Sequence, residues 1–489
     1  MKFWFITGAQ ELYGEETLRM VASDSRKMVK GLNDGGRLPY EIKFTTPVTS
    51  DRAITKLMQS ANADPDCGGV ITWMHTFSPS KMWIEGLGIL EKPYLHLHTQ
   101  FNREIPWNEI DMDFMNLNQS AHGDREHGFI AARLRKPRII AAGYWQDEET
   151  QRKIADFMAA AAGAAESRSV RCARFGDNMR EVAVTEGDKI EAQIRMGWHV
   201  NSWGIGDLAD MMKEIPDSDV GTALDYASRR YEMATDDIAE VRNQLRVKLA
   251  LERFMKENSV TAFVTAFQDL HGMKSLPGMA SQMLMEEGYG FGAEGDWKTA
   301  CLLRVMKVMA KAKGTKGGTS FMEDYTYDLT KGSEAVLGAH MLEVCPSIAG
   351  TKPKIEVHPL SIGGKEPPAR LVFESGESDA INVTVIDIGG RLRMIVQEIH
   401  TIAPLHHMPK LPVAATMWQT KPDFASAAEM WIRCGGAHHF VLSQQLTYAD
   451  MKRFADIMGI ECVRIGDGVC MESLGQMLMI NDIAYRLGI

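Results

Sequence analysis

The sequence predicts an α/β protein with two doubly wound α/β domains followed by a β-rich, barrel-like C-terminal domain. Up to about residue 312, short buried apolar runs alternate with helical patterns, as in parallel βαβ units. Beyond residue 318, apolar and polar residues alternate on either side of a Gly-Gly turn, which is a hairpin signal. The length of 489 residues corresponds to roughly three domains at about 150 residues each.

The first third supplies the first set of βαβ units. We expect strands at residues 3–7, 70–74, 94–98 and 138–142, and helices at residues 15–31 and 118–134. Ligands of such sheets bind beyond the carboxyl ends of the strands, and residues 7–14 lie at one such end. The small-residue stretch 159–165 precedes the first boundary, so the N-terminal α/β domain is predicted over residues 1–168.

The same alternation continues through a central α/β domain, predicted over residues 169–314. A long helix is expected at residues 236–256, a strand at 260–267 and a helix at 296–312, which Asp296 can cap. Glu294 then lies in the loop before the positive end of that helix, a position that favours an ionised carboxylate. The polar, glycine-rich stretch 313–318 ends the domain.

The C-terminal domain, predicted over residues 315–489, should be antiparallel and barrel-like. Residues 381–385 and 392–396 flank Gly389-Gly390 as a hairpin. A strand at 440–443, a helix at 448–458 and a strand at 462–465 are expected to complete it.

Composition limits the classes of function. The net charge is −10 and no basic run stands out, so nucleic acid is not expected as a partner. Seven cysteines, an odd number without a C-x-x-C pair, favour reduced thiols in a cytosol. The N-terminal apolar run is too short for a signal peptide and no stretch approaches a membrane span, so a cytoplasmic location without membrane contact is expected.

Four segments of the second half carry acidic or histidine residues that could form one site. They contain Glu294 (residues 291–298), Glu323 (321–327), His340 (338–347) and the pair His438-His439 (435–439). Two carboxylates and two imidazoles can bind a divalent metal and place a Lewis acid beside proton carriers. Residue types alone leave plainer alternatives open. Glu294 could be only an acid near a helix start, and Glu323-Asp324 a solvated pair. His340 could be a hydrogen-bonded core histidine, and His438-His439 a surface pair.

These four segments, together with residues 8–14, 118–125 and 267–272, resemble L-arabinose isomerases over essentially the whole chain. The resemblance implies interconversion of L-arabinose and L-ribulose, the first step of L-arabinose catabolism, with D-galactose to D-tagatose as a further conversion. It also implies α/β domains of the fucose-isomerase type, Mn²⁺ as cofactor with Co²⁺ or Mg²⁺ as alternatives, and a homohexamer built from two trimers.

The resemblance also implies roles for individual residues. Glu294, Glu323, His340 and His439 would be the metal ligands, and Glu294 and Glu323 also the acid/base pair. His438 would contact the sugar, and His122 would reach the active site of a neighbouring subunit. The sugar pocket would be lined by Gln10, Leu12, Met179, Phe267, Met341 and Ile362.

Two departures from the family pattern concern the surroundings of these residues. Ala9 and Glu11 stand where serine and histidine are usual, and Ala293 stands where glycine is usual. An acid at Glu11 bears on sugar preference more than on reaction type. If the backbone at His438 and His439 is extended, their side chains point to opposite faces, so only one is expected to bind the ion.

Two other functions compete with an isomerase. A nucleotide-using oxidoreductase or transferase would need a phosphate-binding loop, but residues 8–14 contain neither G-x-G-x-x-G nor a P-loop lysine. A non-catalytic sugar-binding protein also uses paired α/β domains, but it would not need carboxylates beside histidines.

Overall fold

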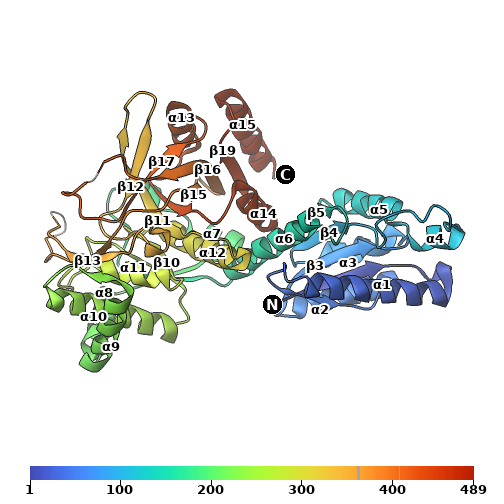
Figure 1. Cartoon of the computed structure of the whole chain (residues 1–489), viewed down its shortest axis with the longest axis horizontal. Coiled ribbons are helices and arrows are strands. Elements are labelled where there is room, and N and C mark those ends of the chain that lie inside the picture. Colours follow the sequence, from blue (N-terminus) through green and yellow to red (C-terminus); the bar gives the residue numbers. More distant parts are fainter. Residues whose placement is uncertain (361–363, 407, 489) are drawn as a thin grey trace. The chain divides into compact units, whose positions relative to one another are not determined.

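The computed structural model describes residues 1–360, 364–406 and 408–488 and divides the chain into two compact units. The first unit contains residues 1–165 and 312–314, and the second contains residues 166–311 and 315–489 (Figure 1). The first unit therefore corresponds to one α/β domain, whereas the second contains both the central α/β region and the C-terminal strands.

The first unit is built on a five-stranded parallel sheet in the order β2-β1-β3-β4-β5. Its strands are β1 (Lys2–Gly8), β2 (Glu41–Phe44), β3 (Cys67–Met74), β4 (Tyr94–His98) and β5 (Ile139–Ala142). Its helices are α1 (Gly14–Asp34), α2 (Asp51–Ala63), α3 (Ile84–Ile89), α4 (Met112–Leu117), α5 (Ser120–Arg133) and α6 (Glu148–Ser167). The four predicted strands and two predicted helices of this region are confirmed, whereas β2, α2, α3, α4 and α6 were not foreseen. The alanine-rich stretch 159–165 lies inside α6, as the high helix propensity of alanine favours.

Strand β1 shows why helices cover both faces of this sheet. Successive side chains of a strand point to opposite faces. Trp4 and Ile6 pack in one core with residues of α2 and α5, whereas the ring of Phe3 lies 5.6 Å from that of Phe157 in α6. The strand is buried on both faces, which explains its continuous apolar sequence.

The central region has a four-stranded parallel sheet in the order β10-β9-β6-β7. Its strands are β6 (Arg171–Phe175), β7 (His199–Trp203), β9 (Ala262–Thr265) and β10 (Gly290–Gly292). Its helices are α7 (Lys189–Met196), α8 (Ile205–Glu214), α9 (Asp217–Arg230), α10 (Ile238–Glu257), α11 (Gly278–Glu286) and α12 (Trp297–Lys313). The predicted strand at 260–267 and both predicted helices are confirmed. A small sheet, β14-β13-β8, joins β8 (Glu232–Met233), β13 (Lys354–Val357) and β14 (Ala369–Val372).

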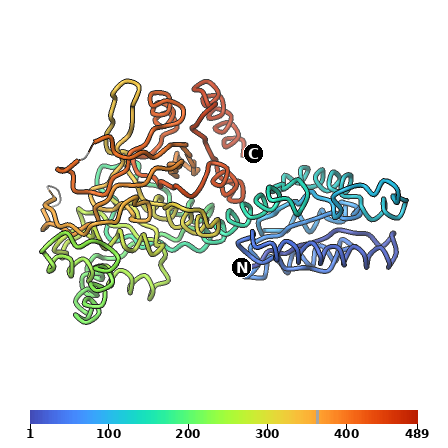
Figure 2. The backbone as a smooth tube through the Cα atoms, in the orientation of Figure 1, coloured from blue at the N-terminus to red at the C-terminus, as the bar shows by residue number. Residues whose placement is uncertain are grey.

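The C-terminal strands close into a six-stranded barrel. The order is β15-β18-β11-β12-β17-β16, and antiparallel pairing of β15 with β16 closes the ring. The strands are β11 (Thr319–Asp328), β12 (Ala335–Ala339), β15 (Ser378–Asp387), β16 (Leu392–Ile402), β17 (Ala415–Thr420) and β18 (His439–Ser443). The predicted hairpin is the β15–β16 pair. In Figure 2 this part of the chain runs from orange to red.

Helices and one further strand pack around the barrel. They are α13 (Phe424–Cys434), α14 (Tyr448–Met458), β19 (Glu461–Ile465) and α15 (Met471–Leu487). The predicted helix at 448–458 and strand at 462–465 are confirmed, and β19 pairs parallel to β16. The expectation that this strand ends the fold was wrong, because α15 follows and its Leu474 packs in a core with α13. Among the described residues, no helix combines the length and apolarity that a bilayer span requires.

Candidate active site

Glu294 lies at a sharp turn between a strand and a helix. Strand β10 ends at Gly292 and α12 begins at Trp297, and Glu294 between them has a φ of +56°. Such backbone is uncommon outside glycine and is often found at functional sites. A Cβ on Gly292 would lie 2.2 Å from the carbonyl oxygen of Asp296, so the turn requires glycine there.

The alanine at position 293 fits this turn. Ala293 is not among the described residues with positive φ, and its side chain is 4% exposed. The position therefore does not need the conformational freedom of glycine, and the departure from the family pattern leaves the turn intact.

The barrel register brings the other three candidate ligands together. Glu323 on β11 pairs with Ala339 on β12, the residue before His340, and with His439 on β18. The imidazole rings of His340 and His439 are 5.7 Å apart between centroids, and both pack edge-on against Phe321. Two consecutive strands and a third strand from much later in the sequence thus present their polar side chains at one place.

The distances between these side chains exceed hydrogen-bond length by a consistent margin. Nε2 of His340 lies 3.9 Å from Oε2 of Glu323, and Nε2 of His439 lies 3.9 Å from Oε2 of Glu294. Two ligand atoms, each about 2.1 Å from one ion, lie roughly 3 Å apart at a right angle and about 4.2 Å apart when opposite. The observed separations fall within this range.

The opposite nitrogens of the two imidazoles face buried carboxylates. Nδ1 of His340 donates a 2.6 Å hydrogen bond to Glu343, and Nδ1 of His439 lies 3.5 Å from Oδ2 of Asp296. Metal-binding histidines commonly have such a carboxylate on the nitrogen that does not bind the ion. The arrangement directs both Nε2 atoms toward the two glutamates.

The burial of His439 makes its unpaired nitrogens informative. The side chain is 0% exposed, and neither ring nitrogen has a hydrogen-bond partner among the described residues. A buried polar atom without a partner costs free energy, so such atoms call for an explanation. A divalent ion bound by Nε2 and the glutamates would account for the unpaired Nε2, and the donor set of oxygen and nitrogen atoms fits Mn²⁺.

Charge within the cluster shifts the pKa values of its members. Burial acts to raise the pKa of Glu294, but His438, His439 and His340 lower it overall. Burial acts to lower the pKa of His340, but Glu343 and the two candidate glutamates raise it overall. Burial acts to raise the pKa of Asp296, whereas Lys298, His439 and Thr299 bring it to about 2. Glu294 and Asp296 are therefore held ionised, and His340 attracts a proton.

His438 lies closer to the cluster than an extended backbone would allow. Strand β18 begins at His439, and His438 lies in the bend before it, so the expectation of opposite faces does not hold here. Nε2 of His438 is 3.8 Å from Oε2 of Glu294, and Glu294, His438 and His439 offer ligand atoms within 4.8 Å of one another. Its pKa is raised mainly by Glu294, and it is 36% exposed, so it can also meet a substrate.

A small pocket of about 30 Å³ adjoins the cluster. Phe267 and Met341, both predicted to line a sugar site, form its wall together with Glu294 and His340. Met179 lies beside the turn, since its backbone N–H donates to the carbonyl oxygen of Glu294 at 2.9 Å. Ile362, the remaining predicted contact from this half of the chain, lies outside the described residues.

The other predicted contacts belong to the first unit, which is described by itself. Gln10 precedes the short helix at Glu11–Tyr13, and Leu12 within it is 83% exposed. His122 is exposed on α5, where its ring stacks on Phe77 at 5.3 Å. Glu11 accepts a 3.4 Å hydrogen bond from Thr49.

The sequence did not indicate the carboxylates that face the Nδ1 atoms of His340 and His439. Asp296 was recognised only as a helix cap, a role that it fulfils through the N–H of Thr299 at 3.3 Å. Lys298, 1% exposed, lies 3.6 Å from Asp296 and donates to the carbonyl oxygens of Thr185 and Glu186. Glu343 follows His340 by three residues, a spacing that could have indicated the pair.

Comparison with known families agrees with this arrangement. Residues 1–169, 171–312 and 318–461 match the family models of the L-arabinose isomerase N-terminal, central and C-terminal domains. The L-arabinose isomerase of Geobacillus stearothermophilus is 53% identical over 99% of this chain and 98% of its own length. That of Thermotoga petrophila is 52% identical over the same shares.

The solved structures add no argument. A glucose-galactose binding protein, GanP from Geobacillus stearothermophilus, is 12% identical with a TM-score of 0.16, covering 65% of this chain and 94% of its own.

The family matches together span nearly the whole chain. The chain therefore belongs to the L-arabinose isomerase family, whose members are aldose–ketose isomerases.

Proposed function

We propose that this chain interconverts L-arabinose and L-ribulose by metal-assisted proton transfer through a cis-enediol, as the first step of L-arabinose catabolism in the cytoplasm. The observation that carries the proposal is the cluster in which Glu294 and Glu323 each face an imidazole Nε2 at 3.9 Å. The names of relatives at 53% identity supply the sugar.

The residues proposed to hold the ion are Glu294, Glu323, His340 and His439. Mn²⁺ is our first choice, with Co²⁺ or Mg²⁺ as alternatives, because the set contains no thiolate. When bound, the ion supplies Lewis acidity that stabilises negative charge on the substrate oxygens. We prefer His340 and His439 to His438 as ligands because each has a carboxylate on its Nδ1 side.

The two glutamates are proposed to move the protons. Isomerisation transfers a proton between C1 and C2 of the open-chain sugar and exchanges carbonyl and hydroxyl. One carboxylate takes the carbon-bound proton and returns it to the adjacent carbon, and the other moves the hydroxyl proton. The neighbouring imidazoles lower the pKa of Glu294, which keeps it ready to accept a proton.

The walls of the pocket are proposed to orient the sugar. The raised pKa of His438 favours the protonated ring, which donates to a sugar hydroxyl. Phe267 and Met341 offer apolar contact to the carbon chain. D-galactose, which is longer by one carbon, is a possible second substrate, and its acceptance depends on the room beside these side chains.

A homo-oligomer with shared sites completes the proposal. We propose a hexamer of two trimers in which His122 of one subunit contacts the sugar held by another. Turnover should fall in His122→Ala without unfolding. Mixed oligomers of His122→Ala and Glu323→Gln subunits should recover part of the activity, and verified mixed oligomers that stay inactive would contradict a shared site.

The function is tested by ketose formation from L-arabinose with EDTA-treated protein, before and after addition of Mn²⁺. Activity restored by the ion would support both the reaction and the cofactor. An inactive, folded, Mn²⁺-loaded oligomer would contradict L-arabinose as substrate, and a panel of aldoses would then identify the replacement.

A further inference from the structure

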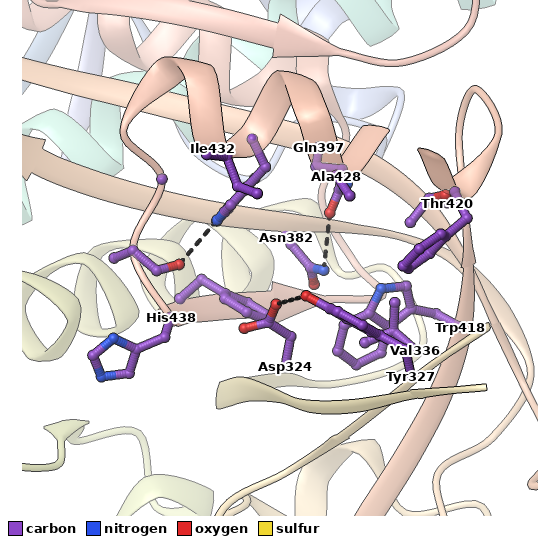
Figure 3. A pocket seen from close by; sticks show the side chains of 15 residues that line it. Asp324, Tyr327, Val336, Asn382, Gln397, Trp418, Thr420, Ala428, Ile432 and His438 are labelled. Atoms are coloured by element: carbon purple, nitrogen blue, oxygen red, sulfur yellow. Dashed lines mark hydrogen bonds between the residues drawn. The ribbon is translucent and has the colours of Figure 1, made fainter. Parts of the chain in front are cut away.

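A second cavity of about 180 Å³ lies in the C-terminal barrel, and all six barrel strands line it. Its residues include Val336 on β12, Phe440 on β18 and Trp418 on β17, with α13 covering one side (Figure 3). Small barrels normally fill their interior with side chains. A cavity at such a place therefore needs an explanation.

The buried floor of the cavity carries an amide with an unused hydrogen-bonding atom. Asn382 on β15 and Gln397 on β16 are cross-strand partners and are 1% and 6% exposed. Nδ2 of Asn382 donates to Oε1 of Gln397 at 3.5 Å, but Oδ1 of Asn382 has no partner among the described residues. Rotating the amide would leave its N–H₂ group unpaired instead, so either orientation leaves capacity for a ligand.

Further polar groups converge on the same space. Oγ1 of Thr420 is buried and also lacks a partner in the part of the chain that the structure describes. Asp324 accepts a 2.9 Å hydrogen bond from the hydroxyl of Tyr327, and Figure 3 shows this pair between His438 and the amide floor. The unpaired amide of Asn382 and the unpaired hydroxyl of Thr420 can each donate or accept a hydrogen bond, which suits a ligand with several hydroxyl groups.

Aromatic side chains form the walls and are fixed in position. A Cβ on Gly338 would lie 2.0 Å from the Trp418 ring, and one on Gly436 would lie 2.4 Å from that of Trp431. Tyr327 and Ile432, 47% and 77% exposed, stand at the mouth. Flat aromatic faces beside hydroxyl acceptors suit the C–H surface and the hydroxyls of a polyol.

We propose that this cavity binds one small, neutral polyhydroxylated molecule, a free monosaccharide or sugar alcohol, in addition to the substrate of the isomerase site. No lysine or arginine is among its lining residues, so a phosphorylated sugar would lack a counter-charge. The cavity adjoins the isomerase site through His438, which lines it and lies 3.8 Å from Glu294.

Hydrogen–deuterium exchange with xylitol tests the proposal, because xylitol has no carbonyl and cannot be turned over. In the Mn²⁺-loaded full chain, xylitol should slow exchange in β15, β16 and α13. Asn382→Leu should weaken this protection about tenfold, the equivalent of one hydrogen bond. Ala428→Phe, which fills the cavity from α13, should abolish it. Ala425→Phe on the exposed face of the same helix is the matched control and should retain it.

Other outcomes decide against the proposal. Absence of protection in the wild type would overturn it, as would equal protection in a folded Ala428→Phe variant. Protection that depends on protein concentration but not on xylitol would mean that a second copy of the chain fills the cavity. Equal protection by xylitol 5-phosphate would refute a neutral ligand. Protection restricted to β11 and β18 would place xylitol at the isomerase site alone.

Discussion

Each unit of the chain contains a buried cluster of histidines and carboxylates, and the two clusters differ in how their hydrogen bonds are used. In the first unit, Asp124 accepts from His96 at 2.8 Å and from His98 at 2.7 Å, and Tyr94 donates to His127 at 2.5 Å. In the second unit, the imidazole Nε2 atoms face their glutamates at 3.9 Å. Direct hydrogen bonds join the carboxylate and the imidazoles of the first cluster, although Nδ1 of His96 and Nδ1 of His127 have no partner among the described residues, whereas the second cluster leaves a gap of the size of an ion between carboxylates and imidazoles.

Residue composition alone therefore does not distinguish a structural cluster from a metal site. Both clusters combine imidazoles with carboxylates at low exposure. Direct contacts at hydrogen-bond distance hold β4 against α5 in the first unit, whereas aligned but separated ligands in the second indicate binding capacity. Substitutions should therefore affect stability in one cluster and chemistry in the other.

The largest effect is expected for Glu323→Gln at saturating Mn²⁺. Glutamine keeps the shape of the side chain but cannot carry a proton, so turnover should fall by about 10²–10⁴-fold. Sugar binding and thermal unfolding should change little. Ketose formation and calorimetric binding check this, and turnover within a few-fold of the wild type would remove Glu323 from the acid/base pair.

Asp124→Asn should produce the opposite result. An amide cannot accept equally from both His96 and His98, and we expect a loss of about 2–3 kcal/mol of local stability. This is less than for a fully buried pair, because His98 is 40% exposed. Deuterium exchange in β4 and α5 should accelerate while Mn²⁺ affinity stays unchanged. Unaltered exchange would show that this cluster does not hold the two elements together.

Glu343→Gln should weaken Mn²⁺ binding about 10–100-fold without unfolding the barrel. The Glu343 carboxylate orients His340 through its Nδ1, and loss of such an orienting group typically has this cost. The matched control is Glu356→Gln, since Glu356 contacts His358 at 2.7 Å but is not part of the cluster. Equal Mn²⁺ affinity in the wild type and both variants, measured by paramagnetic resonance, would contradict the positioning role.

The smallest effect concerns pH. Burial acts to lower the pKa of His340, but Glu343, Glu323 and Glu294 together outweigh burial and raise the pKa above the ordinary 6.5. Protons therefore compete with Mn²⁺ above pH 6.5, and affinity should fall as pH decreases through the raised pKa, by up to about tenfold per unit for one displaced proton. Mn²⁺ titrations between about pH 6 and 8 check this, and a flat profile would mean that His340 is not a ligand.

Much of the fold follows from sequence because local patterns determine local structure. Tyr94–His98 and Tyr448–Met458 have the predicted bounds, since the first is a compact apolar run and the second has a capping threonine and a terminal glycine. Helix α15 was not predicted, because it packs against the distant helix α13 and few features of its own sequence indicate this contact. For the site, the resemblance named Glu294, Glu323, His340 and His439, whereas their chemistry alone left structural roles open.

The sequence by itself determined the place of several strands and helices in each region, the family and the identity of the candidate ligands. Only the tertiary structure decided that Glu323, His340 and His439 meet, because strand register joins Glu323 to the residue before His340 and to His439, which is more than a hundred positions away. It also placed Asp296 and Glu343 behind the imidazoles and opened the cavity around Asn382. Such arrangements depend on non-local pairing and on which buried polar atoms stay unpaired, and no local pattern encodes either.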